Sequence, residues 1–123
     1  MNTRAIIESL IHEMYVTKNV RFGFEKFVHP NYIQHNPDTE DGREATIASI
    51  EGFYGDNPDC SIEIKRVLVD GDIGVTHAHI RRNPCDPGLS VVDFHKVKDG
   101  LIVEHWDVVQ PVPLRSVSAR PMF

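Results

Sequence analysis

Cysteine is scarce in this 123-residue sequence, and the only two, Cys60 and Cys85, stand far apart without a Cys-x-x-Cys spacing. This excludes a thioredoxin-like redox motif and a thiolate metal knuckle. No run of 18 apolar residues is present either, so we expect no contact with a membrane through a spanning helix. The first residues lack the apolar core of a signal peptide, which predicts a cytoplasmic location.

Basic residues are also in short supply. The chain has 13 Lys and Arg against 18 Asp and Glu, a formal net charge of −5. This balance argues against binding of nucleic acid or of an anionic membrane by bulk electrostatics. A Gly-x-Ser-x-Gly nucleophile elbow and phosphate-binding glycine loops are missing, which argues against serine nucleophile and nucleotide chemistry. Small neutral or cationic molecules remain as expected partners.

The first half of the sequence has helical periodicity. Apolar residues recur at three- and four-residue intervals over Thr3–Thr17, which predicts a helix capped by its first residue. A second, shorter helix is predicted over Val20–Val28, and the polar segment Asn31–Pro37 is interpreted as a turn-rich loop. A third helix is predicted to begin at Asp41, which would serve as its N-cap.

From Ser61 onward the pattern changes to a period of two residues. It predicts four strands, over Ser61–Val69, Ile73–Arg82, Leu89–Lys98 and Leu101–Gln110. Helices followed by strands predict one α+β domain over residues 1–123, in which three helices pack on a curved antiparallel four-stranded sheet. Residues 111–123 show no periodicity and are predicted to form an extended tail.

Polar side chains recur on the last three predicted strands. Because positions i and i+2 of a strand share a face, three pairs project together: His77 with His79, Asp93 with His95, and His105 with Asp107. Asp93 lies in an apolar run, either as a buried acid satisfied by its neighbours or as a group that exchanges protons with a ligand.

The last hairpin decides which polar side chains meet. A two-residue turn at Asp99-Gly100 would set Asp93 opposite Trp106, whereas a three-residue loop that includes Lys98 would set it opposite His105. The loop with a glycine bulge is the favoured prediction, because it leaves Asp93, His95, His105 and Asp107 on one face. Phe94, Ile102 and Trp106 would then lie on the opposite face.

One segment of the sequence matches part of a known metal-binding motif. Gly71, His77 and His79 match the opening Gly-x5-His-x-His of a cupin metal site. The Glu expected four or five residues further on is missing, since Asn83 and Pro84 stand there, and a helical first half does not suit a jelly roll. We therefore predict no metal ligand and no cofactor, and keep a His-rich metal-dependent enzyme as a weaker alternative.

Several segments together resemble a known family. They are Tyr32-Ile33-Gln34-His35-Asn36-Pro37, the Asp41-Gly42 helix start, Val92-Asp93-Phe94 and the run from Asp99 to Val108. They resemble SnoaL-like proteins of the nuclear transport factor 2-like superfamily, including a bacterial subgroup described as aldol-condensation enzymes. The resemblance implies a cone-shaped barrel around one apolar pocket, and a homodimer built on the outer faces of the sheets. Polyketide cyclases of this kind use a pocket Asp and His without a cofactor.

Residues and resemblance together predict a cofactor-independent acid–base enzyme acting on a small carbonyl compound, polyketide-like or otherwise apolar, as an aldol-condensation enzyme or cyclase, an isomerase or a lyase. Asp93 and His105 would exchange the proton beside the carbonyl. His35, with Tyr32 or His79, would donate hydrogen bonds to the enolate oxygen. The other predicted substrate-binding residues are Asn36, His95, Asp107 and Phe53. The alternative is a non-catalytic, dimeric module of the same fold that binds a small ligand.

Overall fold

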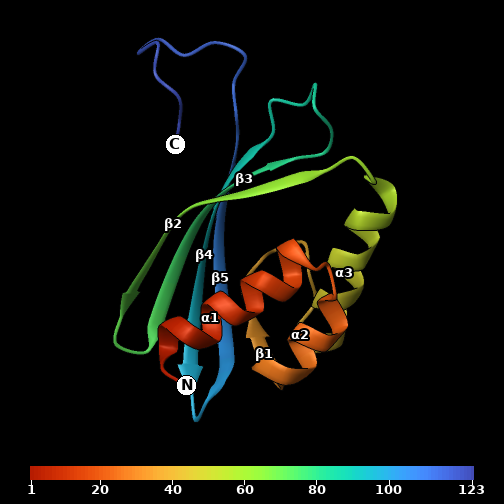
Figure 1. The fold of residues 1–123 in the computed structure, drawn as a ribbon, viewed down its shortest axis with the longest axis vertical. Helices are drawn as coiled ribbons and strands as arrows, with labels where there is room; N and C mark the ends of the chain where they lie inside the picture. The colour runs from red at the N-terminus through yellow and green to blue at the C-terminus, as the bar shows by residue number, and fades with distance from the viewer.

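The computed structural model describes residues 1–123, and it places three helices on one face of a five-stranded sheet (Figure 1). The helices are α1 (Thr3–Ile11), which runs on into a π-helical turn η1 (His12–Val16), α2 (Val20–Phe27) and α3 (Arg43–Asp56). The strands are β1 (Val28–Gln34), β2 (Ser61–Asp70), β3 (Ile73–Arg81), β4 (Leu89–Lys98) and β5 (Leu101–Pro111). The predicted α+β arrangement, with the helices on one side, is confirmed.

The four predicted strands are present and antiparallel, but the sheet has five strands rather than four, because part of the segment expected to be a loop forms strand β1. The strand order is β1-β5-β4-β3-β2, and β1 runs parallel to β5. Proline favours a loop because it cannot donate to a strand ladder, but Pro30 lies on an edge strand. The pairing of β1 with β5 is also irregular between Val28 and Ile33, which spans the proline.

Both predicted helix caps are displaced. The side chain of Asn2 caps α1 by accepting the N–H of Ala5 at 2.8 Å, so Thr3 is already helical. Helix α3 begins after Gly42, whose φ of 94° favours glycine. Asp41 instead accepts the backbone N–H of Gln34 at 2.8 Å, which ties the start of α3 to the end of β1.

The hydrophobic core lies between the helices and the inner face of the sheet. Its buried members come from every helix and from strands β1, β4 and β5: Ile6, Ile7, Leu10, Met14, Val20, Phe24, Phe27, Val28, Tyr32, Ile47, Val97 and Ile102. The figures show the helices together on one side of the sheet. No helix is long and apolar enough to cross a membrane.

The β4–β5 hairpin differs from both predicted registers. Lys98 pairs with Leu101 across a two-residue turn, in which Asp99 and Gly100 have φ values of 51° and 81°. Both central residues therefore have positive φ, as a type I′ turn requires. The pairing then shifts so that Val103 has no partner, and this bulge sets Asp93 opposite Asp107 rather than Trp106 or His105.

Because of the bulge at Val103, Asp93, His95, His105 and Asp107 share one face, as predicted, although the turn differs from the predicted one. His95 pairs with His105, and both are buried on the helix side of the sheet. Ile102 was predicted on the opposite face, but it lies before the bulge and is fully buried in the core. Residues 112–123 contain no helix or strand, and they fold back so that the ring of Phe123 stacks on His79.

Strand β3 approaches α1 so closely that Gly74 has no room for a side chain. A Cβ there would lie 1.9 Å from Cδ1 and 3.2 Å from Cγ1 of Ile7, which is fully buried. We expect Gly74→Ala to lower the free energy of unfolding by about 1–3 kcal/mol through overpacking, measured by urea denaturation. Gly52→Ala is the control, because its Cβ meets nothing within 4 Å in α3, and helix propensity should raise stability by about 0.5–1 kcal/mol. A Gly74→Ala protein as stable as the parent would contradict this close packing.

Candidate active site

One cavity lies between the helices and the inner face of the sheet. Its volume of about 430 Å³ is in the usual range for a small-molecule site. Most of its wall is apolar, formed by Leu10, Met14, Phe24, Ile50, Phe53, Ile62, Ile80, Leu89, Val91 and Ile102 among others. A cluster of polar side chains lies where β1, β4 and β5 adjoin: Gln34, Asn36, Asp93, His95, His105 and Asp107. Asp38, Thr39, Thr46, Ser49 and Arg82 line the cavity elsewhere. The cavity therefore combines a mostly apolar wall with a polar cluster on the sheet.

Asp93 and His105 form the centre of this cluster. Nε2 of His105 lies 2.7 Å from Oδ1 of Asp93, and the two side chains are only 11% and 10% exposed. At this distance the two atoms are joined by a hydrogen bond. Strand β4 carries the acid and β5 the imidazole, so the pair rests on the regular part of the sheet.

Gln34 holds the other side of the His105 ring. Nδ1–H of His105 donates to Oε1 of Gln34 at 2.6 Å. The amide Nε2 of Gln34 donates to the hydroxyl of Tyr32 at 2.9 Å and to Oγ1 of Thr46 at 3.1 Å. Tyr32 and Thr46 are themselves hydrogen-bonded. The chain of contacts thus links α3, through β1, to the imidazole on β5.

Asp107 and His95 complete the polar cluster. Oδ2 of Asp107 accepts from Nδ2 of Asn36 at 2.7 Å. The ring of His95 lies 4.9 Å from that of His105, centroid to centroid, and Nδ1 of His95 is buried without a hydrogen-bond partner. Burial, with a smaller contribution from His105, lowers the pKa of His95 to about 3, so this imidazole is neutral at physiological pH.

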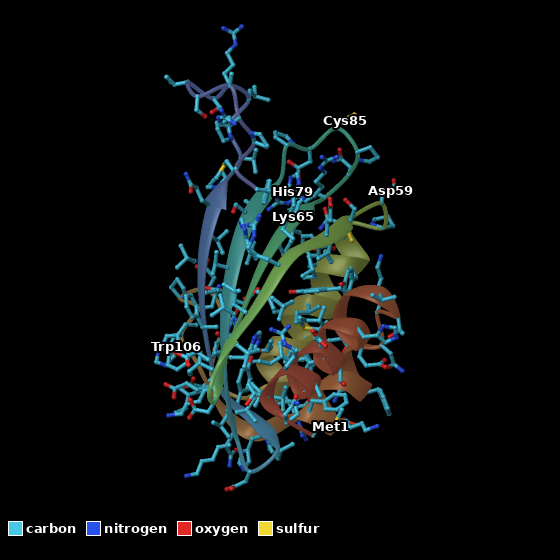
Figure 2. The ribbon with its side chains drawn as sticks, turned by 60° about the vertical axis from the view of Figure 1, so that its left-hand side comes forward. Met1, Asp59, Lys65, His79, Cys85 and Trp106 are labelled. Carbon is cyan, nitrogen blue, oxygen red and sulfur yellow. The ribbon has the colours of Figure 1, made fainter.

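Two of the predicted site residues do not line the cavity. His35 lies on the outer face of the sheet, where Nε2 contacts Oε2 of Glu104 at 2.8 Å and the ring stacks on Trp106 at 5.0 Å. Figure 2 shows Trp106 on the side away from the helices. His79 also faces outward, with Nε2 donating to the carbonyl of Pro87 at 2.8 Å. The placement of both residues in the pocket is therefore corrected.

The other predicted residues do line the cavity: Tyr32, Asn36, Phe53, Asp93, His95, His105 and Asp107. Gln34 and Tyr15 also line the cavity, although neither is among the predicted site residues. Tyr15 lies in the π-helical turn η1, an irregularity that periodicity does not reveal. Burial raises the pKa of Tyr15 well above its usual value and that of Tyr32 to about 12, so both hydroxyls keep their protons. Alternation from the buried Tyr32 would have pointed to Gln34 had β1 been recognised as a strand.

Two groups of side chains have the chemistry of metal ligands. His77 and His79 are the first, but His77 contacts Arg66 through Nδ1 and Ser90 through Nε2, so both of its nitrogens are occupied. Asp93, His105 and Asp107 are the second, with one ligand atom from each within 4.8 Å of the others. Nitrogen and carboxylate donors of this kind suit a divalent transition metal. The distance of 2.7 Å between Nε2 of His105 and Oδ1 of Asp93 is a hydrogen-bond length, so a proton between the two atoms accounts for this contact.

Solved structures of similar proteins identify the fold. TsrD from Streptomyces laurentii superposes with a TM-score of 0.70 at 23% identity, over 86% of this chain and 89% of that one. A protein from Jannaschia sp. CCS1, proposed to be a SnoaL-like polyketide cyclase, gives 0.71 at 18% identity, over 87% and 84%. An NTF2-like protein of unknown function from Cytophaga hutchinsonii gives 0.73 at 15% identity, over 90% and 92%. At these identities the likeness establishes an NTF2-like fold.

The family follows from the sequence match. Residues 9–105 match the SnoaL-like domain, and the chain therefore belongs to the SnoaL-like family. None of the curated proteins matches the chain. The match to the SnoaL-like domain identifies the family and names neither a substrate nor a reaction.

The neutral state of His95 makes stability depend on pH. The pKa of His95 is about 3 in the folded protein against 6.5 for an unperturbed histidine, so the unfolded chain binds the proton more readily. Stability is then full above about pH 6.5 and falls toward pH 3, by up to ~1.4 kcal/mol per pH unit. We expect the parent protein to lose about 2 kcal/mol more than His95→Phe between pH 6.5 and 5 in urea denaturation. Equal losses would show that His95 does not resist protonation.

Proposed function

We propose that this protein is a cofactor-independent acid–base enzyme that moves a proton beside the carbonyl group of a small, largely apolar substrate. The observation that carries the proposal is the buried contact of 2.7 Å between Asp93 and His105 in the wall of a mostly apolar cavity. A carboxyl and an imidazole in contact can accept a proton from carbon and return it elsewhere. Aldol condensation or cyclisation, isomerisation and elimination all begin with such a transfer.

The cavity also offers donors for the oxygen of an enolate. His35 and His79 cannot serve, because they face away from the cavity. His95 is neutral and keeps one N–H, and the protonated hydroxyl of Tyr15 lines the same cavity. Neutral donors in a site of low polarity stabilise a developing oxyanion more than they would in water. We assign His95 and Tyr15 to this role.

Proton transfer can be tested before the natural substrate is known. Small carbonyl compounds are incubated with the protein in D2O, and mass spectrometry measures deuterium gained beside the carbonyl. We expect exchange with at least one compound, and a fall of roughly 10² or more in Asp93→Asn, because the general base is lost. Glu104→Gln is the matched control, since Glu104 contacts His35 on the outer face and should leave exchange unchanged.

Each outcome of this experiment has a consequence. Exchange that is unaffected by Asp93→Asn would overturn the assignment of the proton-transfer pair. Compounds that bind without any exchange would favour the second class of function, a non-catalytic module that holds a small ligand in the same cavity.

We also propose that two copies associate through the outer face of the sheet. Leu68 and Val108 on this face are 61% and 62% exposed, although both are large apolar side chains. An exposed apolar face on a sheet is typical of an interface. We expect sedimentation to give a dimer, and Val108→Asp to give monomers of 14.0 kDa, because a buried charge would oppose association. Leu114→Asp, in the exposed tail, is the control, and a monomeric parent protein would contradict the proposal.

A further inference from the structure

Gln34 makes four hydrogen bonds, and together they determine its orientation. Its Nε2 donates to Tyr32 and Thr46, and its Oε1 is 3.0 Å from the backbone nitrogen of Asn36 and 2.6 Å from Nδ1 of His105. A backbone N–H can only donate, so the side-chain atom that it meets must be the amide oxygen. The contact with Asn36 therefore excludes the flipped amide.

The orientation of Gln34 in turn dictates where His105 carries a proton. An amide oxygen has only lone pairs to offer, so Nδ1 of His105 must bear the hydrogen of their contact. A neutral His105 with hydrogen on Nδ1 has a bare lone pair on Nε2. That lone pair faces Oδ1 of Asp93 at 2.7 Å.

Two bare lone pairs cannot form a contact of this length, so one more proton must lie between Asp93 and His105. The pair then exists as carboxylic acid with neutral imidazole or as carboxylate with imidazolium, and in both forms its net charge is zero. We propose that Gln34 is a positioning residue that holds His105 with hydrogen on Nδ1, so that Asp93 and His105 share one transferable proton. This inference rests on the proposed acid–base function and specifies the protonation state of the pair.

Removing the Gln34 amide should change the number of protons that Asp93 and His105 hold together. Without an acceptor at Nδ1, His105 can place its single hydrogen on Nε2 and donate it to an Asp93 carboxylate. This arrangement keeps the hydrogen bond between Asp93 and His105 with one proton fewer, and the net charge of the pair is −1. The free lone pair of His105 would then be on Nδ1, facing residue 34 rather than Asp93, so the imidazole could no longer exchange a proton with the carboxyl group.

The tautomer can be measured directly and without substrate. In 15N-labelled protein, imidazole nitrogen shifts distinguish a ring with hydrogen on Nδ1, on Nε2 or on both, and the His105 signals are assigned by their loss in His105→Gln. We expect His105 to carry hydrogen on Nδ1 in the parent protein at pH 7, and the neutral Nε2–H form in Gln34→Leu. Gln34→Glu should restore hydrogen on Nδ1, because a carboxylate accepts at the same place. Gln110→Leu, at an exposed position on β5, should change nothing.

Activity provides the second readout. Deuterium exchange should fall roughly a hundredfold or more in Gln34→Leu, as when a catalytic histidine is left in the wrong tautomer, and should recover in Gln34→Glu. If Gln34→Leu fails to fold, Gln34→Met of similar length takes its place. A parent protein with neutral Nε2–H on His105, or a folded Gln34→Leu protein with an unchanged tautomer, would overturn the proposal. Failure of the proposed function is distinguishable, since it would leave the tautomer as described while the parent protein shows no exchange.

Discussion

The parallel pairing of β1 with β5 is the interaction on which the site depends. It sets Gln34 beside His105. Directly after β1, the backbone N–H of His35 also donates to the carbonyl of His105 at 3.0 Å. Side chains alternate along β1, so Tyr32 and Gln34 face the cavity while His35 faces outward. Without this strand, the sheet would still present its acid and its imidazole, but Nδ1–H of His105 would have no acceptor in the wall.

A second constraint is the single unpaired residue Val103. The turn at Asp99-Gly100 alone would leave the following strand in a register that points Trp106 inward and His105 outward. The bulge reverses this alternation after Ile102, which is why an apolar side chain near the turn and the polar His105 both face the helices. One inserted residue thus decides whether the chemistry of β5 enters the cavity or faces solvent.

The sequence was sufficient for the elements that have strong periodicity and insufficient for the contacts between them. Helix α1 and the four antiparallel strands follow from apolar spacing, and the shared face of Asp93 and His105 was reached through an incorrect turn. Strand β1 was not predicted because it contains Pro30. Proline is tolerated at the edge of a sheet, and only the tertiary structure shows that β1 lies there. His79 was misplaced because the sequence does not specify the register between β3 and β4. Thr76 pairs with Asp93, so His79 lies on the other face of β3.

Hydrogen bonding within the polar cluster separates structural groups from those available to a ligand. Unpaired polar atoms are costly inside a protein, and Gln34, Asn36, Asp93 and His105 all find partners. Nδ1 of His95 is the exception in the cavity wall. A buried, unpartnered imidazole nitrogen lowers the stability of the protein, and a ligand in the cavity would supply the partner that Nδ1 of His95 lacks.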